Sequence, residues 1–471
     1  MPKKKNEPLR VVELFAGVGG FRLGLEGYEG KSSSSKYTKN MESNFKVIWS
    51  NQYEPLTVTR QHANYVYKNK WEEGEHTEED IAELINEVPE HDVLVGGFPC
   101  QDYSVATTLK NSKGLKGKKG VLWWSINDIL TAQKNKPDYL ILENVNRLLG
   151  SPASQRGRDF AVMLSCLNNL GYAVEWRVIN AAEYGMPQRR RRVFILGYKK
   201  GSSIYKKIKN EKDWLTKTGV LASAFEVKED NLKIDVIDIS GDTQEISDNF
   251  GLQDGRPRKI SQFKNTGFMK DGKVFTISTV PTKYSKAKLI TFLDSEELID
   301  KEFKDFIIDP DKKLSKVISV KKIISENPIK TKTEKIETEG QLWNYLKGSK
   351  KILRKTLNRD KDSDKEFHEY KYAEGRMIYP DDINEPSRTI ITGEGGSSPS
   401  RFKHVIIRNG RLRRLTPREL ERLNMFPVDH TKYEGVTNVK RSFFMGNALV
   451  VGVVEKIGIS LSKKHKGKVY G

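Results

Sequence analysis

The chain is predicted to form an α/β fold, in which a doubly wound, mostly parallel sheet is joined by a second, smaller domain. From Leu9 to Tyr198, short apolar runs alternate with stretches of helical periodicity, as is typical of parallel strands connected by helices. Beyond about Lys199 this alternation gives way to a sequence rich in lysine, aspartate and serine, which lasts to about Tyr372. A length of 471 residues allows two or three domains.

Six apolar runs are the expected strands of the sheet. Each has the length of a buried strand and is bounded by polar or glycine-rich sequence. The runs are Leu9 to Phe15, Phe45 to Ser50, Asp92 to Phe98, Tyr139 to Val145, Ala173 to Ile179 and Arg192 to Gly197.

Three patterns predict helices. Arg156 to Leu170 has its apolar residues on one face, and Gly171 follows as a stop. Thr416 and Glu419 form a capping box around Pro417, which predicts a helix start. The apolar stretch from Ala448 to Ile459 predicts a helix near the end of the sequence.

The composition is strongly basic. Lysine and arginine number 82 against 62 acidic residues, which gives a net charge of +20 at pH 7. This excess favours a polyanionic partner, although a basic protein without a nucleic-acid role is the alternative. Two cysteines cannot form a disulfide framework, and no long apolar run suggests a signal peptide or a membrane span. We therefore expect a cytoplasmic protein without a membrane partner.

Cys100 is the candidate nucleophile. It follows the apolar run from His91 to Val95, within the segment Gly96-Gly97-Phe98-Pro99-Cys100-Gln101-Asp102-Tyr103-Ser104. The carboxyl end of a strand is where an open α/β sheet holds its chemistry, and a nearby helix start favours the thiolate. A buried structural cysteine is the alternative, and it is the better interpretation for Cys166, which lies on an amphipathic stretch.

Six motifs follow one another along the chain. They are Leu14-Phe15-Ala16-Gly17-Val18-Gly19-Gly20, Gly97-Phe98-Pro99-Cys100-Gln101, Leu142-Glu143-Asn144-Val145, Gln188-Arg189-Arg190-Arg191-Arg192, Arg414-Leu415-Thr416-Pro417-Arg418-Glu419 and Gly446-Asn447-Ala448. In type, order and approximate spacing the chain resembles the DNA (cytosine-5) methyltransferases of bacterial restriction-modification systems. The resemblance implies a Rossmann-like catalytic domain over residues 1–198, a target-recognition domain over 199–375, and a return segment over 376–471 whose C-terminal helix completes the catalytic domain.

The same resemblance implies a binding site for S-adenosylmethionine, which the reaction converts to S-adenosylhomocysteine, and no metal. By themselves the glycines after the first strand are weaker evidence, because their G-x-G-G spacing does not fit the dinucleotide fingerprint. Gln52 departs from the acid that the family places at the ribose, so Glu54 could substitute or the cofactor could bind more loosely. The implied cofactor residues are Phe15, Ala16, Gly17, Val18, Gly19, Gly20, Gln52, Tyr53, Asp80, Ile81, Pro99, Leu122, Asn447 and Ala448.

Four residues are the implied catalytic set. The Cys100 thiolate would add to C6 of cytosine, which makes C5 nucleophilic toward a methyl group. Glu143 would hydrogen-bond the exocyclic amine and share a proton with N3. Arg192 would contact the cytosine O2 and Arg190 the phosphate of the flipped base. A carboxylate at a strand end and a basic surface strand are the alternatives for the last three residues.

The expected partner is double-stranded DNA, from which the target cytosine must be flipped. The lysine-rich stretch from Thr107 to Gly120 resembles the family's mobile active-site loop. A restriction endonuclease acting on the same site is a further expected partner, and we expect a monomer. An RNA-directed enzyme of the same fold that methylates tRNA and a non-catalytic nucleic-acid-binding protein are the alternatives. The recognition sequence cannot be derived from these motifs.

Overall fold

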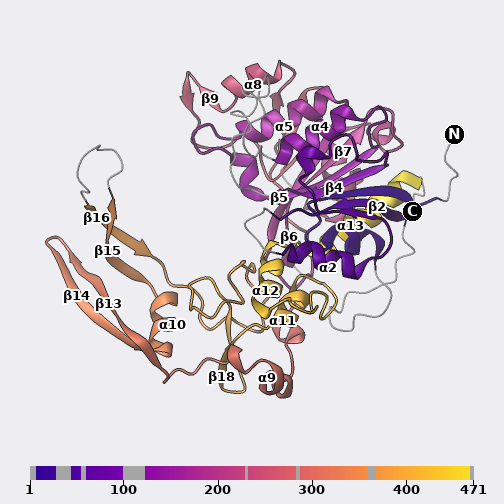
Figure 1. Ribbon diagram of the computed structural model, residues 1–471. Coiled ribbons are helices and arrows are strands. Elements are labelled where there is room, and N and C mark those ends of the chain that lie inside the picture. Colours follow the sequence, from indigo (N-terminus) through magenta and orange to yellow (C-terminus); the bar gives the residue numbers. More distant parts are fainter. Residues whose placement is uncertain are drawn as a thin grey trace. The chain divides into compact units, whose positions relative to one another are not determined.

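The computed structural model describes residues 7–27, 44–54, 60–98, 122–228, 232–282, 287–357 and 367–466 (Figure 1). The chain divides into two compact units. The first unit comprises Met1–Ala287, Glu421–Val436 and Ala448–Gly471, and the second comprises Lys288–Leu420 and Thr437–Asn447.

A ten-stranded sheet is the centre of the first unit, with the order β3-β2-β1-β4-β5-β7-β6-β11-β12-β8. All six predicted strands are present in it. Strand β3 was not predicted, because its three residues, Glu-His-Thr, have no apolar pattern. The strands are β1 (Leu9–Leu14), β2 (Phe45–Asn51), β3 (Glu75–Thr77), β4 (Val93–Gly97), β5 (Tyr139–Val145), β6 (Tyr172–Asn180), β7 (Arg191–Lys199), β8 (Asp235–Asp238), β11 (Thr266–Lys270) and β12 (Lys273–Ile277).

The sheet is mixed rather than mostly parallel. From β3 to β5 neighbouring strands are parallel, as the α/β alternation predicted. From β5 onward every neighbouring pair, beginning with β5 and β7, is antiparallel. The link between β6 and β7 explains the change, because it is too short for a crossover helix and can only return the chain beside the strand it left. The predicted doubly wound α/β fold is thus confirmed, with an antiparallel half added.

The domain boundary expected at residue 199 does not coincide with the division of the structure. Strand β11 pairs with β6, and β12 and β8 extend the same sheet. The first unit therefore continues to Ala287, and the second begins at Lys288. The regular α/β alternation is lost after Lys199 because β8, β11 and β12 have only four or five residues each and the helices between them are short, so the change was taken for the start of a new domain.

Helices cover the sheet of the first unit. They are α1 (Gly20–Glu26), α2 (His62–Lys70), α4 (Leu122–Ala132), α5 (Arg158–Asn169), α6 (Glu211–Asp213), α7 (Val220–Ala224), α8 (Thr243–Asn249) and α13 (Val451–Lys466). The predicted helix from Arg156 is α5, whose start is set by Gly157 at a φ of +90° and whose end is followed by Gly171 at +83°. Helix α13 begins three residues after the predicted Ala448. A two-stranded ribbon of β9 (Leu252–Gln253) and β10 (Arg256–Pro257) completes the unit.

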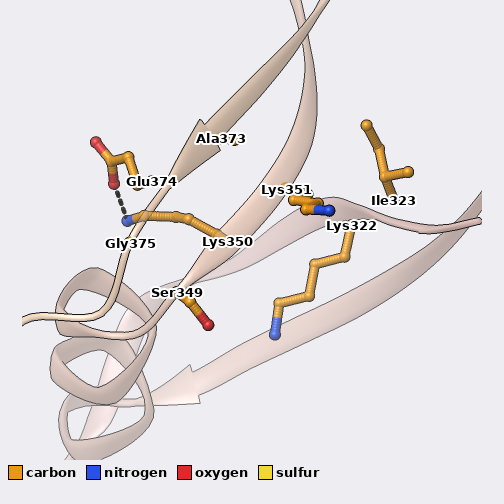
Figure 2. A pocket seen from close by; sticks show the side chains of 8 residues that line it. All are labelled: Lys322, Ile323, Ser349, Lys350, Lys351, Ala373, Glu374 and Gly375. Atoms are coloured by element: carbon orange, nitrogen blue, oxygen red, sulfur yellow. Dashed lines mark ion pairs between the residues drawn. The ribbon is translucent and has the colours of Figure 1, made fainter. Parts of the chain in front are cut away.

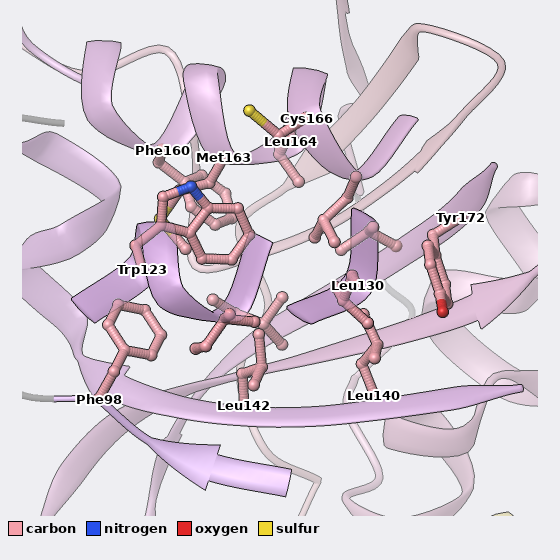
Figure 3. Close-up of a cluster of buried hydrophobic side chains, with 14 of the residues drawn as sticks. Phe98, Trp123, Leu130, Leu140, Leu142, Phe160, Met163, Leu164, Cys166 and Tyr172 are labelled. Atoms are coloured by element: carbon pink, nitrogen blue, oxygen red, sulfur yellow. The ribbon is translucent and has the colours of Figure 1, made fainter. Parts of the chain in front are cut away.

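The main hydrophobic core lies between the sheet and helices α4 and α5 (Figure 3). Phe98, Trp123, Leu140 and Phe160 are among its buried side chains. Cys166 of α5 is buried with them, and burial raises the pKa of its thiol to about 12. A thiol with this pKa is inert at neutral pH, which agrees with the structural interpretation of Cys166.

The second unit contains a four-stranded antiparallel sheet in the order β14-β13-β15-β16 and a two-stranded sheet of β17 and β18. Its helix α11 begins as predicted, since the Thr416 amide donates to Glu419 Oε2 at 2.8 Å and the Glu419 amide donates to Thr416 Oγ1 at 3.2 Å. The strands are β13 (Lys313–Glu326), β14 (Ile329–Thr338), β15 (Lys350–Leu357), β16 (Phe367–Glu374), β17 (Val405–Arg408) and β18 (Arg411–Arg414). The helices are α9 (Glu296–Glu302), α10 (Glu339–Lys347), α11 (Pro417–Leu423) and α12 (Asn438–Asn447). The last three residues of α11 belong to the first unit.

Within the described ranges, no single helix is both long and apolar enough to cross a membrane, and one bent helix pair, α12 with α13, passes by length and composition alone.

Candidate functional site

The topology brings two of the predicted motifs to one edge of the large sheet. Strand β1 lies between β2 and β4, so the order of the strands reverses between β1 and β4. The carboxyl ends of β1 and β4 point the same way because the two strands are parallel, with Leu14 opposite Gly96. Such a reversal is where open α/β sheets bind ligands.

The loop after β1 is held in a left-handed conformation. Phe15 and Gly17 both have a φ of +55°, and Gly19 has a φ of +83°. A methyl group built at Gly17 would meet no atom within 4 Å, whereas one at Gly19 would lie 2.0 Å from the Trp71 ring. Glycine is therefore required at residue 19 by packing and is only favoured at residue 17 by its positive φ, and the space beside Gly17 is open. A loop of this shape can receive a ligand against its backbone.

A buried histidine, His430, also holds the loop after β1 in place. His430 donates its Nε2 hydrogen to the Val18 carbonyl at 2.7 Å, and its ring lies 5.8 Å from that of Trp71. Burial lowers the pKa of His430 to about 4, so the ring is neutral at physiological pH. Sequence analysis did not single out His430 or Trp71, because 412 residues separate His430 from Val18 and neither residue belongs to a recognisable motif.

The two candidates for the ribose contact both have partners in the protein. Gln52 Oε1 accepts the Gly17 amide hydrogen at 2.7 Å. Glu54 Oε2 accepts the Ala63 amide hydrogen at 2.9 Å, in the first turn of α2. Gln52 therefore shapes the glycine loop, and Glu54 caps a neighbouring helix.

The remaining predicted cofactor residues are spread over several elements. Asp80 caps a short 3-10 helix, Ile81–Glu83, by accepting the Ala82 amide hydrogen at 3.1 Å, and Ile81 is buried. Tyr53 is half-buried, and Leu122 begins α4 and packs against the core. Asn447 ends α12 in the second unit, whereas Ala448 belongs to the first. Pro99 lies outside the described residues, as do Cys100 and the lysine-rich loop from Thr107 to Gly120.

Glu143 lies on β5, directly beside the end of β4. It is opposite Gly97 in the parallel register, and a methyl group at Gly97 would lie 3.3 Å from Glu143 Oε2. The side chain is 14% exposed, and its Oε1 is 2.9 Å from Arg192 Nε. Burial raises the pKa of Glu143, and the guanidinium groups of Arg192 and Arg190 offset this only in part. A carboxyl group whose pKa is raised in this way holds a proton more readily than an exposed glutamate does.

The arginine motif leads into β7, with Arg190 directly before the first residue of the strand, Arg191. Arg192 pairs with Glu143, and Arg190 is buried near the same carboxylate. Burial, together with the nearby Arg192, lowers the pKa of Arg190 to about 9, which still leaves it a cation at neutral pH. Arg191, one residue along, is exposed and lies 3.9 Å from Glu183. Two cations and one carboxylate therefore share one face of the sheet.

Asn144 connects this carboxylate strand to the segment that leads to Cys100. Its Nδ2 donates to the Phe98 carbonyl at 3.0 Å, and its Oδ1 accepts the Val145 amide hydrogen at 2.8 Å. The side chain is buried, so water does not compete for these bonds. Sequence analysis had only matched Asn144 to a motif, without assigning it a contact.

Strand β1 contains a buried acid that sequence analysis also missed. Glu13 accepts the Tyr67 hydroxyl hydrogen at 2.8 Å, and burial raises its pKa to about 7. The Tyr67 ring stacks on His76, with 4.4 Å between the ring centroids. The available signal was an acidic residue within the otherwise apolar second half of the run Leu-Arg-Val-Val-Glu-Leu.

Among the described residues, no cluster of three or more histidine, cysteine or acidic side chains could hold a metal ion.

The sequence profile of the family described as C-5 cytosine-specific DNA methylase matches residues 9–463. The chain is 43% identical to the Type II methyltransferase M.Sau3AI of Staphylococcus aureus, over 97% of this chain and 96% of that protein. The Type II methyltransferase M.SsoII of Shigella sonnei is 32% identical over 42% of this chain and 45% of its own. Among solved structures, a methyltransferase of Entamoeba histolytica aligns with a TM-score of 0.49 at 13% identity, over 98% of each chain.

Proposed function

The chain belongs to the family of C-5 cytosine-specific DNA methylases, and we propose that it methylates a target cytosine in duplex DNA with Cys100 as nucleophile and Glu143 as proton-holding acid. It is a DNA (cytosine-5) methyltransferase, which transfers a methyl group to C5 and gives 5-methylcytosine.

We propose S-adenosylmethionine as the methyl donor, which enzymes of this family use, and S-adenosylhomocysteine as its product. When bound, the cofactor supplies an electrophilic methyl group. The loop from Phe15 to Gly20 suits such a ligand, because Gly17 leaves open space beside a left-handed backbone. The Phe15 ring is placed beside Gly96, since a methyl group at Gly96 would lie 3.5 Å from Phe15 Cδ2. An aromatic ring in this place suits the adenine base.

Cys100 and Glu143 would act on opposite parts of the cytosine ring. A bond forms between the Cys100 sulfur and C6, and the electron pair displaced from the C5–C6 bond makes C5 a nucleophile. Glu143 hydrogen-bonds N3 and the exocyclic amine, and its raised pKa allows it to share a proton with the ring as charge develops. After methylation C5 loses its proton, and the C6–sulfur bond breaks to release Cys100.

The arginines would hold the flipped nucleotide. Arg192 already lies against Glu143, so a base that bonds Glu143 through N3 would present its O2 to the same guanidinium. Arg190 would bind the phosphate of this nucleotide, for which a permanent cation is suited. Asn144 acts as a positioning residue, because it fixes Phe98, two residues before Cys100, to the strand of Glu143.

The observation that carries the catalytic proposal is the Glu143–Arg192 pair at the end of β5, opposite Gly97 of the cysteine motif. DNA with 5-fluorocytosine at the target tests it, since fluorine at C5 blocks proton loss and leaves the enzyme attached to DNA. We expect a denaturation-resistant adduct with the wild type and with Cys166→Ser, and none with Cys100→Ser. An adduct in Cys100→Ser would remove that residue as the nucleophile.

The setting is a Type II modification system, as the relatives indicate. We propose that a restriction endonuclease shares the target site, that the enzyme acts as a monomer, and that it works in the bacterial cytoplasm. Bisulfite sequencing of plasmid DNA from cells expressing the chain would give the activity and the target sequence together. A parallel assay on tRNA tests the RNA-directed alternative, which predicts methylated tRNA and unmodified plasmid.

Target recognition is proposed for the region that sequence analysis placed at residues 199–375, and within it for the part that belongs to the second unit, from Lys288 onward. Exchange of residues 288–375 for those of a relative with another specificity should move methylation to the relative's site. Bisulfite mapping would show the change. Methylation that stays at the original sequence would place recognition in the first unit, where residues 199–287 extend the large sheet.

A further inference from the structure

Few side chains of the sheet β14-β13-β15-β16 in the second unit are buried. Of the side chains that the structure describes on its four strands, only Ile336 and Lys350 are buried. The sheet consists of two hairpins, β13–β14 and β15–β16, which join through one residue pair, Lys322 opposite Ile352 (Figure 1). A two-stranded hairpin without a core is marginally stable in water, so packing alone does not explain these long strands.

The charge of the four strands is strongly positive. Twelve lysine and arginine residues stand on them, against five glutamates. A shallow hollow of about 460 Å³ at the junction of the hairpins is lined by Lys322, Lys350 and Lys351, each of which is paired with a glutamate (Figure 2). The net positive charge of the four strands is complementary to a polyanion.

On the face of the sheet toward α10, the lysine side chains pair with other groups of the protein. Lys322 pairs with Glu334 and lies over the Tyr345 ring of α10. Lys350 pairs with Glu374 at 3.1 Å and lies over the same ring, 4.6 Å from its centroid. Tyr345 contacts both lysines, so α10 covers this face of the sheet. The cationic side chains of Lys322 and Lys350 hold the hairpins to the helix.

The opposite face of the β13–β14 hairpin carries free cations and hydroxyl groups. Strand alternation and the register place Ser319 opposite Lys335, and Lys321 opposite Thr333, with Thr331 on the same side. Lys321 and Lys335 are exposed, and no acidic group of the described chain pairs with either of them. They lie diagonally across the two strands, a separation of about 7–8 Å.

We propose that this face of the β13–β14 hairpin, defined by Ser319, Lys321, Thr331, Thr333 and Lys335, is the surface that enters the major groove of the DNA substrate. The proposal rests on the function proposed above. The major groove, about 12 Å wide and 8.5 Å deep, accepts a two-stranded ribbon. At about 3.3 Å per residue, the ten residues of β14 span about 33 Å, close to one turn of the duplex. Lys321 and Lys335 bind phosphates, and Thr331 and Thr333 face the base edges.

The salt dependence of DNA binding tests the two lysines. Each phosphate contact contributes about 0.9 to the slope of log affinity against log salt, so Lys321→Ala/Lys335→Ala should lower this slope by about two. The matched control is Lys301→Ala/Lys304→Ala, which removes two exposed lysines elsewhere in the same unit and should keep the slope. Lys321→Arg/Lys335→Arg should also keep it. Thermal melting of each variant reports on folding.

Each other outcome has a definite meaning. A slope in Lys321→Ala/Lys335→Ala equal to that of the control would overturn the assignment. Aggregation or dimer formation at an unchanged slope would show that the lysines protect an exposed strand edge, and would overturn it as well. If the wild type makes no 5-methylcytosine in duplex DNA, the proposed function fails, and the failure is separate because binding is measured without turnover.

The hydroxyl groups are tested by specificity. Thr331→Val/Thr333→Val keeps the side-chain shape and removes two groups that hydrogen-bond base edges. We expect the ratio of cognate to non-cognate affinity to fall by tenfold or more, while the salt slope stays as in the wild type. An unchanged ratio would show that this face binds the DNA backbone without reading the sequence, and would overturn the groove placement.

Discussion

The two sheets of this protein differ in what their strands bury. Between β3 and β6, the ten-stranded sheet is packed against helices, and most of its side chains are inaccessible to water, as at Val11, Leu94, Leu140 and Val174. The four-stranded sheet exposes both apolar and charged residues along its hairpins, and Ile324 is 64% exposed. The first sheet holds its side chains in a packed core, and the second exposes charged side chains. Sequence changes should therefore cost stability in one sheet and DNA affinity in the other.

The sharpest contrast is expected from one truncation in each sheet. Leu140→Ala on β5 should lower the free energy of unfolding by about 2–5 kcal/mol, because it leaves a cavity in the main core. Ile324→Ala on β13 should change it by no more than about 0.5 kcal/mol, because that side chain is exposed. Urea unfolding followed by the fluorescence of the buried tryptophans measures both. Similar losses would mean that the hairpin has a partner that covers it.

Replacing the carboxyl group of Glu143 should affect turnover more than binding. Glu143→Gln keeps the shape and removes the carboxyl group that we propose shares a proton with the base, so methyl transfer should slow by about 100-fold or more. DNA and cofactor affinity should remain within a few fold of the wild type. Single-turnover transfer of a labelled methyl group measures the rate. Near-normal transfer at saturating substrates would exclude Glu143 from the chemistry.

Two glycines of the loop after β1 offer a matched pair. Gly19→Ala must displace the Trp71 ring and should destabilise the protein by about 1–3 kcal/mol. Gly17→Ala meets no atom and suffers only the strain of a positive φ, about 1 kcal/mol. Thermal melting without cofactor compares them. A larger loss for Gly17→Ala would show that the space beside it is filled in the folded protein.

The pH dependence of stability should separate His430 from Glu13. His430 has a pKa of about 4 when folded and an ordinary value of 6.5, so the unfolded chain alone takes up its proton between these values. The wild type should therefore lose stability relative to His430→Gln as the pH falls from 6.5 to 4, by about 1.4 kcal/mol per pH unit at most. Urea midpoints at each pH give this difference.

Glu13 should behave in the opposite way, because its folded pKa of about 7 lies above its ordinary value of 4.5. In this interval the folded state holds the proton, so the wild type should gain stability relative to Glu13→Gln as the pH falls from 7 to 4.5. The tyrosine and cation that face Glu13 are Tyr67 and Arg22, and both favour its ionised form. A difference of the same sign for both variants would show that one of the two groups is not buried as described.

The sequence predicted the parallel half of the fold well, because each buried strand there is an apolar run. It failed where strands are polar or very short, as in β3 and the exposed hairpin β13–β14, since no periodicity distinguishes them from loops. The domain boundary at 199 failed for a related reason. The strands β8, β11 and β12 have only four or five residues each and the helices before β11 are short, so the loss of regular alternation was mistaken for the end of the domain.

For the candidate site, the motifs located Glu143, Arg190 and Arg192, which the structure brings to one face. Spacing along the chain could not indicate that Asn144 bonds the Phe98 carbonyl or that His430 bonds the Val18 carbonyl, because both contacts depend on tertiary packing. Nor could it show that Gln52 would turn toward Gly17. Residues that position a loop through tertiary contacts are harder to predict from a sequence than the motif residues of the loop itself.

The hydrogen bond from His430 to Val18 also concerns how the protein is made. A ribosome adds roughly 5–20 residues per second, so the 412 residues between these two take on the order of 20–80 s to synthesise. During that time Gly20 lacks Phe426 and Leu449, and Gly24 of α1 lacks Val454 of α13. The glycine loop is thus translated long before the residues that pack against it. Nascent chains therefore cannot complete the packing of this loop until the residues from Phe426 to Val454 have been synthesised.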